Sequence, residues 1–238
     1  MLCLAALACG KAFAEDRLLF SRDELLVGSR PVSQAYLGTL KEVDRTTATT
    51  RRIERAFARM VQQAKRVRPD AEGWDWNLVL VASDAVSALA LPEGRIFIST
   101  GWVHRRRLSD GEIALLAAHE IAHVIAEHLR ERVSAFAAAR PAQKLTVAAV
   151  LRIVAEEWVL ARELEPLMQA QEFEADRIGM ALVCAAGIAP VRALTLFDKM
   201  TRPDAVGDLS YVRSHAGPLE RKLDLIAWMQ AENLACPD

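Results

Sequence analysis

The sequence of 238 residues lacks any continuous apolar run of the roughly 20 residues that a membrane-spanning helix needs. The longest candidate, residues 145–160, is interrupted by Arg152, Glu156 and Glu157. An excess of one charge is also missing, since 30 Lys and Arg residues nearly balance 31 Asp and Glu residues. We therefore expect no transmembrane segment in the mature chain, and the charge gives no indication of a nucleic-acid partner.

Repeats and low-complexity segments are also missing, and the length suits one packed domain. We predict a single α+β domain over residues 15–238, mostly helical, with a small antiparallel sheet. Apolar residues at helical spacing, or helix start and stop signals, predict helices over 33–67, 109–139, 143–163, 167–185, 190–200 and 218–232. Two short β-rich runs, 76–82 and 95–100, predict the sheet.

Only four cysteines are present, two of them near the N-terminus. Residues 1–14 are apolar and end in Ala-Phe-Ala, which is typical of a secretory signal peptide, here without its basic first part. A buried first helix is the alternative, and lipid attachment at Cys9 is a third interpretation. After cleavage only Cys184 and Cys236 would remain. An oxidising compartment would allow them to pair, and two free thiols are the equal alternative.

A His-Glu-x-x-His motif lies inside the helix predicted from residue 109, which begins with a capping box of Ser109 and Glu112. Residues four apart on a helix point nearly the same way, so His119 and His123 can hold one metal ion. Glu120 is then placed to accept a proton from a metal-bound water. Two ordinary core histidines are the alternative, so the prediction depends on a third ligand.

A catalytic zinc ion needs three protein ligands and an open position. His128 is nine residues after His119, which on one continuous helix is half a turn out of phase, so we assign it to the surface or a second layer. Glu172 and Asp176 are four residues apart on a predicted helix and share one face, whereas Glu174 should face away. One of the two can bind zinc while the other accepts a hydrogen bond from a ligand imidazole.

The motif pair, His119 to His123 followed by Glu172-x-x-x-Asp176, resembles the HtpX and CAAX prenyl protease type of gluzincin metallopeptidases. The resemblance implies a zincin-like fold with the small sheet beside the active-site helix. It also selects His119, His123 and Glu172 as ligands of one Zn²⁺ and gives Asp176 the supporting role. This type also includes soluble periplasmic members, so we expect export to the bacterial periplasm.

Two flanking segments are similar to the same family. Residues 87–98 are similar to its N-A-F-x-x-P-G-G segment, with Ser87 in place of Asn and Glu93 in place of the first Gly. This similarity implies that Ala88, Leu89 and Ala90 form a strand beside the cleft, where substrate adds. The segment from Ser214 resembles S-H-P-x-x-x-x-R and contains His215 and Arg221. The resemblance implies that His215 either stabilises the oxyanion or occupies the open coordination position of a resting form, and that Arg221 contacts substrate.

The predicted activity is therefore zinc-dependent hydrolysis of peptide bonds, with Glu120 as general base. The expected partners are protein or peptide substrates, among them misfolded or outer-membrane and other envelope proteins. A chaperone or assembly factor that binds clients in the same cleft with little proteolysis is the alternative function.

Overall fold

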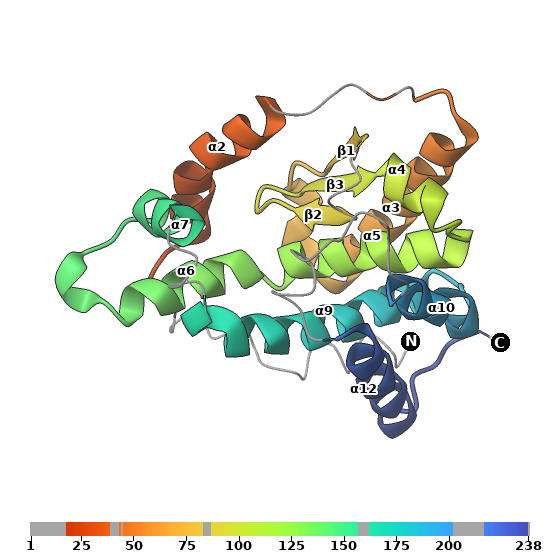
Figure 1. Cartoon of the computed structure of the whole chain (residues 1–238). Helices are drawn as coiled ribbons and strands as arrows, with labels where there is room; N and C mark the ends of the chain where they lie inside the picture. The colour runs from red at the N-terminus through yellow and green to blue at the C-terminus, as the bar shows by residue number, and fades with distance from the viewer. Residues whose placement is uncertain are drawn as a thin grey trace.

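The structure is a computed structural model, and it describes residues 18–38, 43, 45–82, 87–156, 162–201 and 217–237. The predicted mostly helical α+β architecture is confirmed (Figure 1). Within these ranges no helix has both the length and the apolar character needed to cross a membrane. The predicted signal peptide at residues 1–14, which contains Cys9, and His215 lie outside the described residues.

The elements follow one another along the chain as α2 (Arg22–Gly38), α3 (Ala48–Val67), η2 (Pro69–Gly73), β1 (Asn77–Val81), β2 (Ala88–Ala90), β3 (Arg95–Ser99), α4 (Thr100–Arg105), α5 (Asp110–Ile125), α6 (His128–Ala138), η3 (Pro141–Gln143), α7 (Val147–Glu156), η4 (Arg162–Leu164), α9 (Glu165–Ala185), α10 (Pro190–Met200) and α12 (Pro218–Ala231). Helix α5 lies between the sheet and α9 (Figure 1). It is buried along almost its whole length, because small and apolar residues occupy nearly every position.

The sheet has three strands in the order β1-β3-β2. Strand β2 pairs with β3 antiparallel, across a turn in which Gly94 has a φ of 98° that favours glycine. Strand β1 pairs with β3 in parallel, so the expectation of a wholly antiparallel sheet is corrected. The residues of the turn predict the β2–β3 hairpin. No signal in the local sequence indicates that β1 pairs with β3 and not with β2.

The predicted start of α5 is confirmed, but its predicted length is wrong. Ser109 caps the helix by accepting a hydrogen bond from the Glu112 N–H, and the Glu112 carboxylate accepts one from the Ser109 N–H. The helix ends at Ile125 because Glu127 adopts a left-handed conformation with a φ of 55°, after which α6 begins. A continuous helix to residue 139 is therefore excluded.

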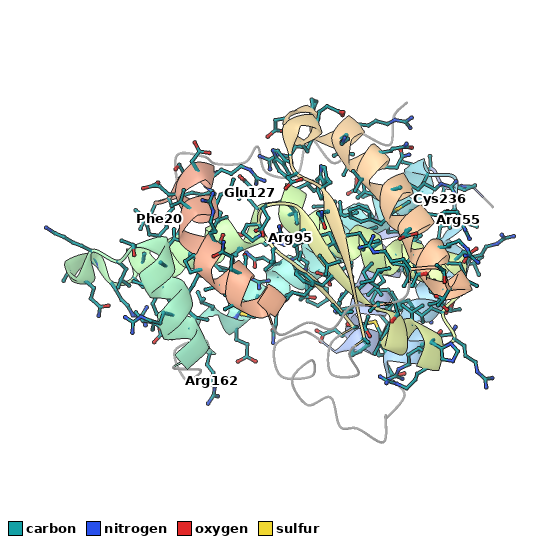
Figure 2. All side chains as sticks on the ribbon, turned by 90° about the horizontal axis from the view of Figure 1, so that it is seen from above. Phe20, Arg55, Arg95, Glu127, Arg162 and Cys236 are labelled. Atoms are coloured by element: carbon teal, nitrogen blue, oxygen red, sulfur yellow. A yellow bond between two sulfur atoms is a disulfide. The ribbon has the colours of Figure 1, made fainter. Side chains whose placement is uncertain are left out.

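Three arginines surround the buried carboxylate of Glu127 at this break. Arg22 from α2, Arg68 and Arg130 lie 3.2, 3.6 and 2.9 Å from its oxygens. Arg130 also donates a hydrogen bond to the carbonyl of Phe20. Phe20 and Glu127 are both labelled near α2 in Figure 2. These contacts compensate the backbone strain of a non-glycine residue at positive φ.

A disulfide joins Cys184, at the end of α9, to Cys236, which follows α12. The two cysteines are 52 residues apart, and closing a loop of that length in the unfolded chain corresponds to about 4 kcal/mol in the chain-entropy account. We expect a double Cys184→Ala, Cys236→Ala variant to unfold with a free energy lower by about 2–4 kcal/mol in urea titrations. Equal midpoints for the variant and the oxidised protein would contradict this stabilising role.

Candidate metal centre

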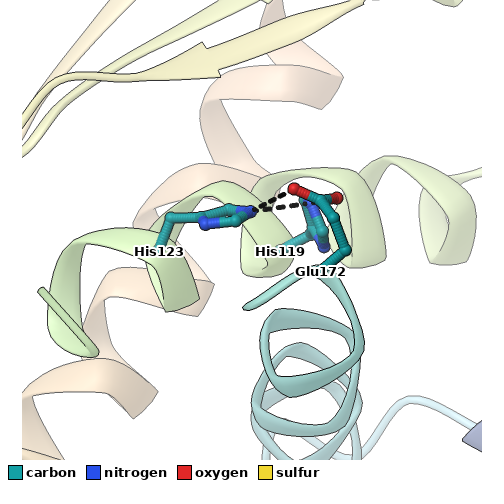
Figure 3. A group of neighbouring side chains, drawn as sticks. All are labelled: His119, His123 and Glu172. Carbon is teal, nitrogen blue, oxygen red and sulfur yellow. Dashed lines mark hydrogen bonds and ion pairs between the residues drawn. The ribbon is translucent and has the colours of Figure 1, made fainter. Parts of the chain in front are cut away.

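The side chains of His119, His123 and Glu172 converge on one point (Figure 3). The Nε2 atoms of the two histidines are 3.1 Å apart. Oε2 of Glu172 lies 3.3 Å from Nε2 of His119, and its Oε1 lies 3.4 Å from Nε2 of His123. Ligands about 2.0–2.1 Å from a tetrahedral zinc ion are separated by about 3.3 Å, so this donor set fits zinc.

A close approach of two helices brings the donors together. His119 and His123 lie on α5, and Glu172 lies on α9, which packs along it. At Gly179 the Cβ atom of any other residue would be only 3.1 Å from the backbone nitrogen of His119. Glycine at this position lets the two backbones meet directly beneath the site.

Asp176 and Arg221 lie behind the three converging side chains. Asp176 Oδ1 accepts a hydrogen bond from Nδ1 of His119 at 3.0 Å, which leaves Nε2 facing the site. Arg221 donates from Nε and Nη2 to the two Asp176 oxygens, each at 2.7 Å, and its Nη1 lies 3.1 Å from Glu172. Arg221 is only 2% exposed, so the expected substrate contact is corrected: its guanidinium holds two carboxylates beneath the site.

The environment gives the titratable groups different pKa values. Burial is the largest influence on His123 and holds its pKa well below the usual value, so this ring is neutral as a ligand must be. Burial and Arg221 lower the pKa of His119, but hydrogen bonds to Asp176 and Glu172 outweigh them and raise it to about 9. Burial raises the pKa of Asp176, but Arg221 reverses this and keeps it below its ordinary value.

Glu120 follows His119 on α5 and is not one of the converging donors. Burial, the largest influence, raises the pKa of its carboxyl to about 7, with the charge of Glu172 acting in the same direction. Such a group suits proton transfer near neutral pH.

Strand β2, with Ala88, Leu89 and Ala90, is an edge strand of the sheet and lies next to α5 (Figure 1). His128 was assigned no ligand role by helical phase, and it is not among the converging donors. Its ring nevertheless contacts His123, with the two Nδ1 atoms 2.7 Å apart. Helical phase could not show this contact, because the chain is not one helix from His119 to His128.

Residues 47–228 match the family described as Peptidase family M48. The chain belongs to this family. Among curated proteins, it is 30% identical over 161 residues to Mitochondrial metalloendopeptidase OMA1 of Arabidopsis thaliana, covering 63% of the chain and 31% of the relative. The protein of the same name from Schizosaccharomyces pombe is 28% identical over 166 residues, 65% of the chain and 47% of the relative. The one from Saccharomyces cerevisiae is 24% identical over 250 residues, with 94% and 70% covered.

The chain thus spans about a third to a half of the length of the first two relatives. The expected metallopeptidase resemblance is confirmed as membership of family M48, although the relatives are named OMA1 and not HtpX or CAAX protease. The expected location in the bacterial periplasm is overturned, because all five curated relatives are named as mitochondrial proteins.

Proposed function

We propose that this M48 chain is a zinc-dependent endopeptidase that hydrolyses peptide bonds in protein or peptide substrates. The observation that carries the proposal is the convergence of donor atoms from His119, His123 and Glu172: the two Nε2 atoms are 3.1 Å apart, and each lies 3.3–3.4 Å from one of the two Glu172 oxygens. Two imidazoles, each neutral when it binds the metal, and one carboxylate are a common ligand set of catalytic zinc, and they leave one position open.

When bound, zinc supplies the Lewis acidity that polarises the scissile carbonyl and lowers the pKa of water. Glu120 accepts a proton from the attacking water and returns it to the leaving nitrogen. Asp176 keeps the proton of His119 on Nδ1, and Arg221 compensates the charges of Asp176 and Glu172. For His215 we keep the two roles that the family resemblance implies, oxyanion stabilisation or occupation of the open position.

We propose extended, unfolded segments as substrates. Strand β2 pairs on one side with β3, and in the described sheet no strand pairs with its other side. An extended peptide can add to such an edge through main-chain hydrogen bonds, as in other cases of strand addition. Ala88, Leu89 and Ala90 would contact the peptide, and the small side chains of the two alanines leave room for it.

The test is metal content together with cleavage of unfolded casein by the purified full chain. We expect one zinc ion per chain, removal of cleavage by a chelator and its return with one equivalent of zinc. A His123→Ala variant should hold no zinc, whereas His104→Ala, an exposed histidine on α4, should match the unchanged protein. Cleavage by a protein shown to be metal-free would contradict the proposal.

A further inference from the structure

The geometry points to His128 as a positioning residue for the ligand His123, with Glu174 as its partner. This inference rests on the proposed zinc site. His128 Nδ1 lies 2.7 Å from Nδ1 of His123, and the rings meet edge-on with centroids 4.8 Å apart. The other ring nitrogen of His128, Nε2, lies 3.6 Å from Oε2 of Glu174.

The break between α5 and α6 places His128 there. Because Glu127 has a positive φ, α5 and α6 are not one continuous helix, and His128, the first residue of α6, contacts His123 in the last turn of α5. His128 is then 2% exposed, and Nε2 of the buried Gln171 on α9 donates a hydrogen bond to its carbonyl at 3.3 Å. Both helices that carry the proposed zinc ligands therefore contact His128, α5 at its ring and α9 at its backbone carbonyl.

The two Nδ1 atoms are so close that one of them must carry a proton and the other must accept it. If His123 carries the proton on Nδ1, its Nε2 presents a lone pair to the ligand triangle. If His128 carried it, the Nε2 of His123 would hold a proton and could not bind a metal. Zinc binding therefore requires His128 Nδ1 to be the acceptor.

Glu174 favours the same arrangement. A neutral His128 that accepts through Nδ1 carries its proton on Nε2, which faces the Glu174 carboxylate. The opposite tautomer would turn a lone pair towards a carboxylate oxygen, which is repulsive. Glu174 was expected to face away from the metal, and it does not join the donor triangle; its contact acts through two imidazoles in series.

The ligands thus have two different supports. His119 donates directly to a buried carboxylate, Asp176, whereas His123 donates to a neutral ring that is itself oriented by the 40%-exposed Glu174. Partners of this kind typically contribute 10- to 100-fold to metal affinity. We infer that His128 makes a contribution of this size and that Glu174 makes a smaller one.

Zinc affinity, measured by competition with a chromophoric chelator, tests the inference. His128→Leu introduces an apolar side chain of similar bulk that has no hydrogen-bond acceptor, so the zinc affinity of this variant should fall about 10- to 100-fold. His128→Asn places an oxygen where Nδ1 was and should stay within about 3-fold of the unchanged protein. Circular dichroism and melting of the zinc-free proteins show whether each variant folds.

The inference is overturned if folded His128→Leu binds zinc as tightly as the unchanged protein, or if His128→Asn is as weak as His128→Leu. We expect a Glu174→Gln variant to fold, because this side chain is partly exposed. It should weaken zinc binding about 2- to 5-fold, whereas Glu165→Gln, on the same helix beside Gln169, should not. Equal effects of the two would also overturn it.

Long-range ¹H–¹⁵N spectra of the five histidines give a second, structural readout. In the zinc-loaded protein we expect His123 with its proton on Nδ1 and His128 with its proton on Nε2. A proton on Nδ1 of His128 would overturn the inference even if no variant folded. If the unchanged protein bound no zinc, the proposed function itself would fail; normal zinc binding with an unaffected His128→Leu would remove only the positioning role.

Discussion

Replacing Glu120 by Gln is expected to leave zinc binding intact and to lower kcat/KM for peptide cleavage by roughly 10²- to 10⁴-fold. Gln has the shape of Glu but cannot accept a proton from water or return it to the leaving nitrogen. Because Glu120 is not one of the converging donors, its replacement should not disturb the triangle of His119, His123 and Glu172. Cleavage rates of a fluorogenic peptide, with zinc content determined on the same samples, measure both effects.

Glu72→Gln is the matched control, since this carboxylate lies on η2 with 73% of its side chain exposed and pairs only with Lys65 among the contacts described. It should cleave at the rate of the unchanged protein. If Glu120→Gln cleaved normally with its zinc in place, the assignment of Glu120 as general base would be wrong. If it lost its zinc, Glu120 would have a structural role in the site.

Replacing Arg221 by Met is expected to lower the free energy of unfolding by about 3–5 kcal/mol. The guanidinium compensates two buried carboxylates, of Asp176 and Glu172, which are 2% and 1% exposed. Met fills a similar volume but leaves both carboxylate charges without this partner. Removing one member of a buried ion pair is far more destabilising than replacing both members by apolar residues. Urea titrations should be run in chelator, so that lost zinc affinity does not contribute.

The same pair of helices offers a control. Arg177 on α9 makes a bidentate pair with Asp224 on α12, but the two side chains are 39% and 31% exposed. Exposed pairs contribute about 0–1 kcal/mol, so Arg177→Met should lie within that range. Equal losses for Arg177→Met and Arg221→Met would show that Arg221 serves only to join the helices.

The features that could be predicted from the sequence were those set by local pattern. The capping box of Ser109 and Glu112 marked the start of α5, and four-residue spacing placed His119 beside His123. Assigning Glu172 as the third ligand needed the family motif, because a charged face on a helix is common without a metal. The structure then brought that carboxylate to the two imidazoles.

The features that could not be predicted depend on contacts between distant segments. Two of the three arginines that compensate the left-handed turn at Glu127, Arg22 and Arg68, come from distant segments, so local sequence alone does not predict this turn. Helical phase left His128 either at the surface or in a second layer, and only the structure, with that turn, places it against His123. Burial of Arg221 beneath the converging side chains likewise depends on the packing of α12 on α9. The parallel pairing of β1 with β3 depends on which edge of the β2–β3 hairpin β1 joins.

X-ray absorption spectroscopy of the zinc-loaded full chain tests the central claim most directly. The account predicts one zinc ion per chain with a first shell of two imidazole nitrogens, one carboxylate group and an oxygen from solvent, at about 2.0–2.2 Å. In a Glu172→Gln variant the carboxylate contribution should disappear while both imidazoles stay. A shell that contained sulfur, or a spectrum unchanged by Glu172→Gln, would contradict a site built from His119, His123 and Glu172.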